Sequence, residues 1–368
     1  MNILFITNHL NIGGITSYVF SLAAGLKNKG HNVYLASSGG DYLTRFTGEG
    51  IIFIPIPIRT KSEINVFKIG ASFLGLLGHI REKQIQVVHT NSRVTQVLGH
   101  LLKKRTGVAH VTTWHGFFQP RWSRKAFPCK ADKTIAVSEQ VRKHLLNDFQ
   151  ASQKDVELIY NGIDPQKIRL KEPLSRSEVK ARLGIKDGPV VGIIARLSEV
   201  KGHIYLIRAM KGVISEFPDA RLLIVGEGRM EDELARLCRE LKIDKNVTFI
   251  ARAREIAELY YIMDVFVMPS LNEGLGLGLM EAMAASKAVV GSAVGGIKDL
   301  IKDRENGLLV GAQDAEGLRK AILELLNDPA GAAIMGNKAR VFINQNFSLE
   351  KMIGRTEEVY SQCLNGTG

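Results

Sequence analysis

The stretch that decides the fold is Pro269-Ser270-Leu271-Asn272-Glu273-Gly274-Leu275-Gly276-Leu277-Gly278-Leu279-Met280-Glu281-Ala282. It follows the apolar run Val265–Met268, which predicts a buried strand, and it leads into an apolar segment that predicts a helix. Glu273 lies in a part too rich in glycine to be helical, and Glu281 lies about one turn into the helix beyond it. A strand, a glycine-rich turn and a helix in this order indicate a parallel α/β sheet, in which ligands bind at the carboxyl ends of the strands.

The rest of the chain repeats this alternation of short apolar runs and amphipathic segments almost from end to end. Such an alternation predicts parallel sheets with helices on both faces. In the first half the predicted strands are Asn2–Asn8, His31–Ser37, Ile51–Pro55, Val87–Thr90, Ala109–Thr113 and Thr134–Val137. In the second half they are Val190–Ala195, Arg221–Val225, Val247–Ile250, Val265–Met268, Ala288–Ser292 and Gly307–Val310.

The two series meet at Asn161-Gly162-Ile163-Asp164-Pro165. Asn-Gly and Asp-Pro favour turns, and a residue before proline is disfavoured in a helix. A chain of 368 residues suits about two domains. We therefore predict an α/β fold of two tandem Rossmann-like, doubly wound domains that face a central cleft. Their predicted bounds are residues 1–165 and 166–345, followed by a helical tail, residues 346–368, that packs back on the N-terminal domain.

Two carboxylates of the deciding stretch are candidates for binding a nucleotide-sugar. Glu273 and Glu281 could each accept hydrogen bonds from a pair of hydroxyls, one pair on each sugar of such a ligand. The backbone of Gly274, Leu275 and Gly276 leaves room for the ligand and exposes amides to its phosphates. A solvated pair of glutamates is the alternative, but it gives no reason for the three glycines between them.

A second strand-to-helix turn carries two cations. Arg196 follows the predicted strand Val190–Ala195, and Lys201-Gly202 precede a predicted helix that begins near His203. Two permanent positive charges and a helix N-terminus at one loop suit a diphosphate. The alternative is a surface ion pair between Arg196 and Glu199.

A pair of glycines, Gly13-Gly14, follows the first predicted strand and precedes a helix. Paired glycines let a backbone approach a ligand and leave helix amides free for an anion, although a tight turn explains the pair equally well. The pair does not form the Gly-x-Gly-x-x-Gly fingerprint, and no Gly-Lys-Ser/Thr element occurs in the sequence. The sequence therefore indicates neither a dinucleotide oxidoreductase nor a P-loop enzyme.

The Glu-x₇-Glu element from Glu273 to Glu281 resembles that of the family-4 retaining glycosyltransferases, also described as glycosyl transferases group 1, which have the GT-B fold. The run from Arg196 to Gly202, Arg-Leu-x₃-Lys-Gly, resembles the diphosphate clamp of that family. Further similar elements are Gly13-Gly14, Asn161–Asp164, Gly295-Gly296 and Asn306–Val310. The resemblance is continuous from about Pro189 to Val310 and looser over residues 1–165, which would bind the acceptor while residues 166–345 bind the donor.

The resemblance implies a role for each matching residue. Arg196 and Lys201 would hold the diphosphate, Glu273 would contact the transferred sugar, and Glu281 would contact the ribose. His115, in Thr113-Trp114-His115-Gly116, matches the family's cleft histidine, which reaches the donor sugar near the reacting bond. The catalytic candidates are thus His115, Glu273, Arg196 and Lys201, and the donor-binding candidates are Gly13, Gly14, Arg196, Lys201, Gly274, Leu275, Gly276 and Glu281.

The sequence departs from the family pattern at two places. Ser286 and Ala288 stand where the family usually has Gly and Pro after the helix that carries Glu281. Ala251 replaces the glycine that is usual after the strand near the base. The first departure is expected to alter only a turn, whereas the second leaves the base contacts undefined.

No metal site is predicted, because an Asp-x-Asp element is absent from the sequence. Arg196, Lys201 and a helix N-terminus would stabilise the leaving diphosphate instead. We expect no cofactor beyond the nucleotide-sugar substrate, for which a UDP-sugar is the favoured choice. The resemblance implies retention of anomeric configuration, through either a covalent intermediate or attack on the same face.

The net charge of +12 lies entirely in the first half of the chain. Residues 1–170 hold 22 lysines and arginines against 10 aspartates and glutamates, whereas the rest is balanced. The excess is densest in the run Lys103–Lys143, where Trp114, Phe117, Phe118, Trp122 and Phe127 lie among the cations. A basic face with aromatics suits an anionic membrane surface, and the alternative is a solvated basic face whose aromatics lie in the core.

We expect a glycan or lipid-linked acceptor of the lipopolysaccharide type, peripheral contact with the membrane and no nucleic-acid partner.

The location predicted for the chain is cytoplasmic, at the inner face of the cell membrane. The three cysteines are far apart and odd in number, which favours a reducing compartment. Met1–Thr7 lacks the features of a signal peptide, and no apolar run reaches the roughly 18 residues that span a bilayer. The nearest such run, Ile64–Ile80, predicts a buried helix of the N-terminal domain.

Three other functions remain open from the residues alone. A nucleotide-sugar epimerase would act on the donor without an acceptor. A phosphorylase of the same architecture would need pyridoxal phosphate. A non-catalytic module that binds nucleotide or nucleic acid would use the basic face alone.

Overall fold

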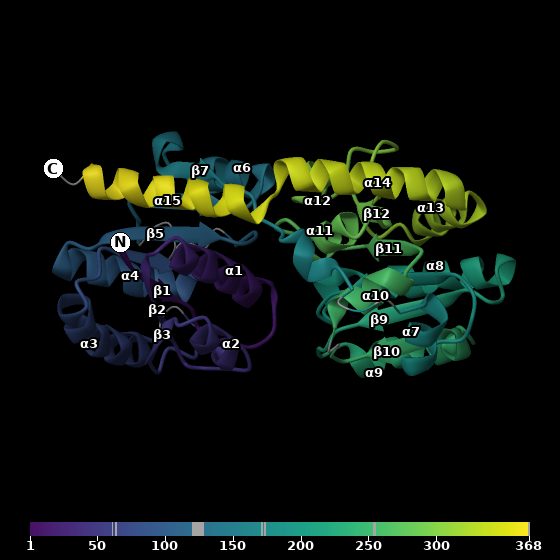
Figure 1. Ribbon diagram of the computed structural model, residues 1–368, viewed down its shortest axis with the longest axis horizontal. Helices are drawn as coiled ribbons and strands as arrows, with labels where there is room; N and C mark the ends of the chain where they lie inside the picture. The colour runs from purple at the N-terminus through teal and green to yellow at the C-terminus, as the bar shows by residue number, and fades with distance from the viewer. Residues whose placement is uncertain are drawn as a thin grey trace. The chain divides into compact units, whose positions relative to one another are not determined.

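The computed structural model describes residues 1–60, 62, 65–119, 129–170, 172, 174–252 and 255–366. Its contacts divide the chain into two compact units. Unit 1 consists of Met1–Gly162 and Leu349–Gly368, and unit 2 consists of Ile163–Ser348. Each unit is built around one parallel sheet, and Figure 1 labels elements of both units.

Unit 1 contains a seven-stranded parallel sheet with the strand order β3-β2-β1-β4-β5-β6-β7. The direction of strand addition reverses between β1 and β4, so the loops after these two neighbouring strands diverge there. The strands are β1 (Asn2–Ile6), β2 (Asn32–Ser37), β3 (Ile52–Pro55), β4 (Val87–Thr90), β5 (Ala109–Trp114), β6 (Lys133–Ala136) and β7 (Val156–Leu158).

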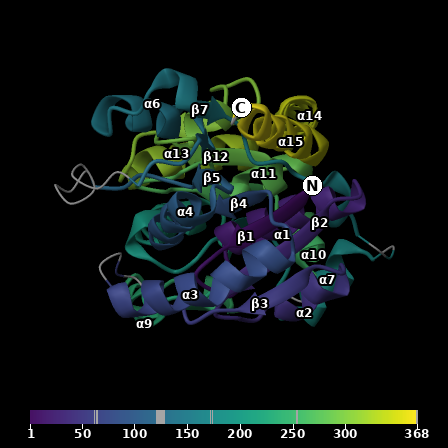
Figure 2. The same cartoon turned by 90° about the vertical axis from the view of Figure 1, so that its left-hand side faces the viewer.

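Helices cover both faces of this sheet, because alternate strand residues point to opposite sides and both sets are apolar. Phe5 packs into one core cluster with α1 and α15, whereas Leu4 packs into another with α3 and α4. Figure 2 shows these two groups of helices on opposite sides of the strands. The helices are α1 (Gly14–Asn28), α2 (Leu43–Gly48), α3 (Val66–Glu82), α4 (Arg93–Thr106), α6 (Glu139–Asp148), the 3₁₀ turn η1 (Gln153–Asp155) and α15 (Leu349–Asn365).

The C-terminal helix α15 is an integral part of the core of unit 1. Met352, Ile353 and Tyr360 are buried against α1 and the strands. Gly25 of α1 permits this packing, since a Cβ there would lie 2.1 Å from Cδ1 of Ile353. The chain changes unit twice, and the two passages lie side by side, because the amide of Ile163 donates to the carbonyl of Phe347 at 2.8 Å.

Unit 2 contains a six-stranded parallel sheet with the strand order β10-β9-β8-β11-β12-β13. Here the direction of strand addition reverses between β8 and β11. The strands are β8 (Val190–Ile194), β9 (Arg221–Val225), β10 (Val247–Ile250), β11 (Val265–Met268), β12 (Ala288–Ser292) and β13 (Leu308–Val310).

The helices of unit 2 bury the apolar strands in the same manner, with α8, α9 and α13 closing one large core cluster. Tyr260 and Phe266, also in unit 2, are among the largest fully buried side chains of the protein. The helices are α7 (Arg176–Arg182), α8 (His203–Glu216), α9 (Glu231–Glu240), α10 (Ile256–Ile262), α11 (Leu277–Ala284), α12 (Ile297–Leu300), α13 (Ala315–Asn327) and α14 (Pro329–Asn346), with 3₁₀ turns η2 (Pro165–Ile168), η3 (Glu199–Lys201) and η4 (Asp244–Asn246).

The predicted alternation of strands and helices is confirmed in both units, and two details differ. Strand β7 was not predicted, because its three residues are too few to show a hydrophobic pattern. The prediction of a buried helix at Ile64–Ile80 is wrong in part. Helix α3 buries only one stripe, and its Phe67 is 87% exposed. Among the described residues, no helix combines the length and the apolar composition that crossing a membrane requires.

Ser286 adopts a left-handed backbone conformation with φ of 59° in the turn after α11. This conformation costs a residue with a side chain roughly 1–2 kcal/mol, whereas glycine adopts it freely. Glycine also gives the unfolded chain more conformational entropy, which offsets part of the gain. We therefore expect Ser286→Gly to increase the free energy of unfolding by about 0.5–1 kcal/mol. Chemical denaturation measures this change.

The neighbouring substitution Ala285→Gly is the matched control, because Ala285 has φ of −78°. It should lower stability by roughly the same amount, since it gains nothing in the folded state. If Ser286→Gly lowered stability as Ala285→Gly does, the strain assigned to Ser286 would be refuted.

Candidate functional site

The predicted donor-binding residues of unit 2 lie at the point where the direction of strand addition reverses. Arg196 and Lys201 follow β8, and Glu273 follows its neighbour β11. Loops from adjacent parallel strands emerge at the same edge of the sheet and diverge at such a point, which leaves a crevice for ligands. Residues that are more than 70 positions apart in the sequence are thereby brought together.

The ion pair between Lys201 and Glu273 is the central contact of this site. Lys201 Nζ lies 2.5 Å from Glu273 Oε2, and both side chains are mostly shielded from solvent. Ser270 Oγ donates to the same carboxylate oxygen at 3.2 Å. The structure therefore joins two residues that the sequence assigned to different parts of a ligand, and it adds Ser270, which sequence reasoning missed.

Arg196 is exposed and makes no hydrogen bond or ion pair with any of the described residues. The alternative of an Arg196–Glu199 pair is not observed, because Glu199 accepts from Arg229 at 3.1 Å. An unpaired guanidinium beside the paired Lys201 leaves this edge of the sheet with a surplus of positive charge. Such a cation is available to an anionic ligand at no cost of breaking a protein contact.

Two helices begin at this edge with their first amides free of side-chain caps. Gly202 precedes α8 and Gly276 precedes α11, and neither helix start is capped by a side chain. The free N–H groups at helix N-termini carry partial positive charge and bind anions. The backbone of Gly274, Leu275 and Gly276 leads directly into the second of these starts.

Close backbone contacts hold the Glu273 loop in place. Gly295, with φ of +47°, packs so near that a Cβ would lie 1.9 Å from the carbonyl oxygen of Glu273. The amide of Gly296 donates to the same oxygen at 3.0 Å. Gly202 makes a similar approach to Pro269, at 1.9 Å from the carbonyl oxygen to a built Cβ. Side chains at these positions would displace Glu273.

Glu281 is held by Tyr260, a residue that sequence reasoning also missed. The Tyr260 hydroxyl donates to Glu281 Oε2 at 2.8 Å. Burial raises the pKa of the Glu281 carboxyl to about 7, and the hydrogen bond from Tyr260 lowers it in part. A carboxyl with this pKa is divided between its neutral and ionised forms at neutral pH.

His115 of unit 1 lies at the end of β5 and forms a pair with Asn91 at the end of β4. His115 Nε2 lies 3.1 Å from Asn91 Oδ1, and the Tyr18 ring packs edge-on against the imidazole with the centroids 4.7 Å apart. Burial lowers the pKa of His115 to about 3, so the imidazole is neutral at physiological pH. Sequence reasoning missed Asn91, whose position directly after a predicted strand was its only signal.

Gly13 and Gly14 lie at the start of α1, in the connection that follows β1. Gly13 has φ of 162°, an extended conformation that other residues also adopt, and a Cβ there would meet no atom within 4 Å. Neither a turn nor local packing therefore requires this glycine. The open space is compatible with a ligand at the same edge of the sheet.

The structure agrees only in part with the predicted basic and aromatic face in Lys103–Lys143. Trp114 is buried, because it packs edge-on against Phe118 and Phe149. It is therefore a core residue and not a surface aromatic, which corrects the expectation for this position. Lys103 pairs with Asp132. Arg121, Trp122, Arg124, Lys125 and Phe127 lie outside the described residues.

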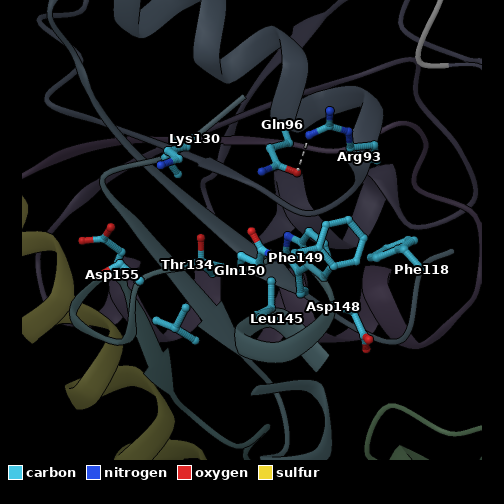
Figure 3. Close-up of a pocket in the computed structure, with 15 residues that line it drawn as sticks. Arg93, Gln96, Phe118, Lys130, Thr134, Leu145, Asp148, Phe149, Gln150 and Asp155 are labelled. Carbon is cyan, nitrogen blue, oxygen red and sulfur yellow. Dashed lines mark hydrogen bonds between the residues drawn. The ribbon is translucent and has the colours of Figure 1, made fainter. Parts of the chain in front are cut away.

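Trp114 also lines a cavity of about 180 Å³ between α4, α6 and the sheet of unit 1. Phe118, Leu145 and Phe149 form its apolar wall, and all three are labelled in Figure 3. Polar groups of Arg93, Gln96, Lys130, Asp148 and Asp155 lie around the apolar wall. An apolar interior with a charged rim suits an amphipathic ligand.

The sequence-predicted residues thus fall into two groups. Unit 2 brings together Arg196, Lys201 and Glu273, with Glu281 on the helix that follows, and unit 1 holds His115 with Gly13 and Gly14. Among the residues that the structure describes, no cluster of three or more His, Cys, Asp or Glu side chains could hold a metal ion.

Two family models match the chain, one over each half. The model of Glycosyltransferase Family 4 matches residues 12–167, and that of Glycosyl transferases group 1 matches residues 175–342. The alpha-maltose-1-phosphate synthase of Mycolicibacterium smegmatis is 30% identical over 305 residues, which cover 74% of this chain and 78% of that protein.

A second relative and a solved structure match almost the full length. The UDP-Gal:alpha-D-GlcNAc-diphosphoundecaprenol alpha-1,3-galactosyltransferase of Escherichia coli is 24% identical over 354 residues, covering 91% of this chain and 90% of that protein. HepE of Anabaena, solved in complex with UDP and glucose, superimposes with a TM-score of 0.88 at 21% identity, covering 98% of this chain and 99% of that chain. The predicted GT-B fold is confirmed.

The raised pKa of Glu281 has a consequence for stability. The folded state binds this proton more tightly than the unfolded chain does, so stability falls as pH rises from about 4.5 to 7, and the loss is complete above that range. Glu281→Gln removes the ionised form. We expect it to increase the free energy of unfolding by about 1–2 kcal/mol at pH 8 and by much less at pH 5.

Thermal or chemical denaturation at the two pH values measures this difference. Glu240→Gln, at an exposed position on α9, is the control and should show no such dependence on pH. An equal effect of Glu281→Gln at pH 5 and pH 8 would contradict the raised pKa.

Proposed function

Since the chain belongs to glycosyltransferase family 4, we propose that it transfers a sugar from a nucleotide-sugar to a glycan or lipid-linked acceptor, with retention of configuration and without a bound metal. Membership of the family establishes glycosyltransfer itself. The donor, the stereochemistry, the independence from metal and the acceptor are the parts that we propose.

The observation that carries the proposal is the cluster of Arg196, Lys201 and Glu273 where the strand direction reverses in unit 2. A diphosphate at this edge would meet the unpaired Arg196 guanidinium, the free amides of two helix starts and the Lys201 ammonium. As Lys201 turns to the phosphates, Glu273 is released from its ion pair. Its carboxylate then accepts hydrogen bonds from hydroxyls of the transferred sugar.

The same cluster explains how the anomeric bond could break without a metal. Negative charge develops on the departing diphosphate, and fixed positive groups lower the energy of that transition state. Arg196, Lys201 and the start of α8 supply such a field. Metal-dependent enzymes use a cation held by carboxylates for this purpose, whereas this edge of the sheet presents cationic side chains.

Glu281 and Tyr260 are proposed to bind the ribose. The ionised Glu281 carboxylate accepts hydrogen bonds from the two ribose hydroxyls, and the Tyr260 hydroxyl fixes its orientation. In unit 1, neutral His115 would contact the donor sugar near the reacting bond. A neutral imidazole can both donate and accept a hydrogen bond, which suits contact with sugar hydroxyls.

A UDP-sugar is the proposed donor, because HepE of Anabaena binds UDP with a closely similar fold. A lipid-linked acceptor of cell-envelope polysaccharide is proposed because the relative from Escherichia coli acts on a diphosphoundecaprenol. The cavity lined by Trp114, Phe118 and Phe149 would suit the apolar part of such an acceptor.

Peripheral contact with a membrane is proposed for the surface formed by α3 and α4, defined by Val66, Phe67, Leu74, Lys104 and Arg105. The three apolar side chains of this α3–α4 surface are 65–87% exposed, and both cations are exposed at the end of α4. The two helices pack against each other over one face of the sheet. Exposed apolar side chains on α3 and exposed cations on the neighbouring α4 favour contact with an anionic bilayer.

Calorimetric titration of UDP, GDP and ADP in EDTA tests the donor site. We expect one nucleotide, UDP, to bind most tightly, and Arg196→Ala and Glu281→Ala each to weaken it by about 10-fold or more, because each removes charge-assisted hydrogen bonds. Arg340→Ala, which removes an exposed cation of α14, should leave the affinity unchanged. The proposed donor site would be refuted if no nucleotide bound, or if neither substitution changed the affinity for the nucleotide.

Flotation with vesicles tests the proposed membrane contact. We expect the protein to float with vesicles that contain phosphatidylglycerol at low salt, and not with pure phosphatidylcholine. Replacing Phe67 and Leu74 by Ser, or Lys104 and Arg105 by Glu, should reduce the bound fraction at least several-fold, since each cation near the surface contributes about 1 kcal/mol. Because Ile334 and Val341 are exposed apolar residues of unit 2, replacing both by Ser is the matched control. Failure to float at low salt would overturn the membrane contact.

A further inference from the structure

We propose that Asn91 is a positioning residue that fixes His115 in the tautomer protonated at Nε2 and turns its own amide N–H toward the substrate. The proposal rests on the proposed function only for the identity of that substrate, a nucleotide-sugar. The pairing of Asn91 with His115 is independent of it.

The contact between the two side chains determines which nitrogen of the imidazole carries the proton. Asn91 Oδ1 lies 3.1 Å from His115 Nε2. In this orientation the Asn91 amide turns its carbonyl oxygen toward the ring, and because a carbonyl oxygen only accepts hydrogen bonds, we assign Nε2 as the donor and Nδ1 as the free acceptor of the neutral ring. His115 Nδ1 makes no hydrogen bond with any described residue, which leaves it available to a sugar hydroxyl.

Asn91 is itself held rigidly. Its side chain is 1% exposed, and its backbone amide donates to Thr95 Oγ1 at 3.2 Å. Thr95 belongs to the capping box that starts α4, together with Ser92. A capped helix start therefore fixes the backbone of Asn91, so that the orientation of His115 follows from that of α4.

A second polar pair lies on the same face of the sheet, two residues earlier in each of the two segments. His89 Nε2 lies 2.7 Å from Thr113 Oγ1, and these residues precede Asn91 and His115 by two positions on β4 and β5. Tyr18 contacts both pairs, since its hydroxyl lies 3.2 Å from Thr113 Oγ1 and its ring packs on the His115 imidazole. Tyr18 thereby connects this second pair with the imidazole of His115.

The amide nitrogen of Asn91 points to a ligand. Asn91 Nδ2 is buried and has no hydrogen-bond partner among the described residues. Buried N–H groups are almost always satisfied, so this one has a partner outside the chain, and we assign that partner to the ligand. A hydroxyl can donate a hydrogen bond to His115 Nδ1 and accept one from Asn91 Nδ2. The pair is therefore suited to binding a hydroxyl.

The test observes the imidazole directly and needs no substrate. Full-length protein labelled with ¹⁵N at histidine is studied by long-range ¹H–¹⁵N correlation, and the His115 signals are identified by their loss in His115→Gln. We expect the wild type to show protonated Nε2 and unprotonated Nδ1 at pH 7.5. A wild-type spectrum with the proton on Nδ1 overturns the proposal without any variant of Asn91.

Two variants separate positioning from packing. Asn91→Ala should give a mixture of His115 tautomers and lower the kcat for release of UDP from a UDP-sugar by about 10-fold or more, with a smaller change in KM. Asn91→Asp keeps an acceptor oxygen, so the Nε2 proton should persist, while the new carboxylate raises the pH at which His115 titrates. A His115 spectrum that is identical in the wild type and Asn91→Ala overturns the proposal.

The other face of the same two strands provides the control. Thr90 Oγ1 lies 2.9 Å from His110 Nε2, a buried cross-strand pair that does not touch His115. Thr90→Val should therefore leave the His115 signals unchanged. Calorimetric UDP binding in parallel distinguishes the two claims. If UDP fails to bind the wild type, the proposed donor site is wrong, whereas the spectrum still decides the role of Asn91.

Discussion

All strands of each sheet run in one direction, and this constraint governs everything else in the structure. Parallel strands need helical connections, so both faces of each sheet are covered and most strand residues are apolar. The same arrangement gathers every carboxyl end at one edge. Where the direction of strand addition reverses, between β1 and β4 and between β8 and β11, neighbouring loops diverge and leave space for ligands.

The Lys201–Glu273 ion pair shows how such an edge can be kept ready for a charged ligand. Each side chain neutralises the charge of the other, and the Ser270 hydroxyl satisfies a further lone pair of the carboxylate. The surrounding backbone gives Glu273 little freedom, because Gly295 and Gly202 pack against the loop at distances that exclude side chains. The loop is thus held rigidly while the Glu273 carboxylate faces the Lys201 ammonium.

In unit 1, pairs of polar side chains hold the His115 region in place. Its polar side chains form two pairs between neighbouring segments, Asn91 with His115 and His89 with Thr113. The Tyr18 ring packs against the His115 imidazole. The Tyr360 hydroxyl of α15, 2.5 Å from His89 Nδ1, closes the far end of this arrangement. A C-terminal helix that returns to the first unit therefore belongs to the structural support of the His115 region.

Much of this protein could be inferred from its sequence, because apolar periodicity, glycine-rich turns and isolated cations are local features of a chain. They predicted nearly every strand and the two doubly wound units, and they made Arg196, Lys201, Glu273 and Glu281 candidates for a donor site. Contacts between distant segments were beyond that reasoning. The partners Asn91, Tyr260 and Ser270 carry no local signal, the burial of Trp114 depends on Phe149, and the exposed face of α3 depends on what packs beside it. Only the tertiary structure decided these, because burial and pairing are properties of residues that folding brings together.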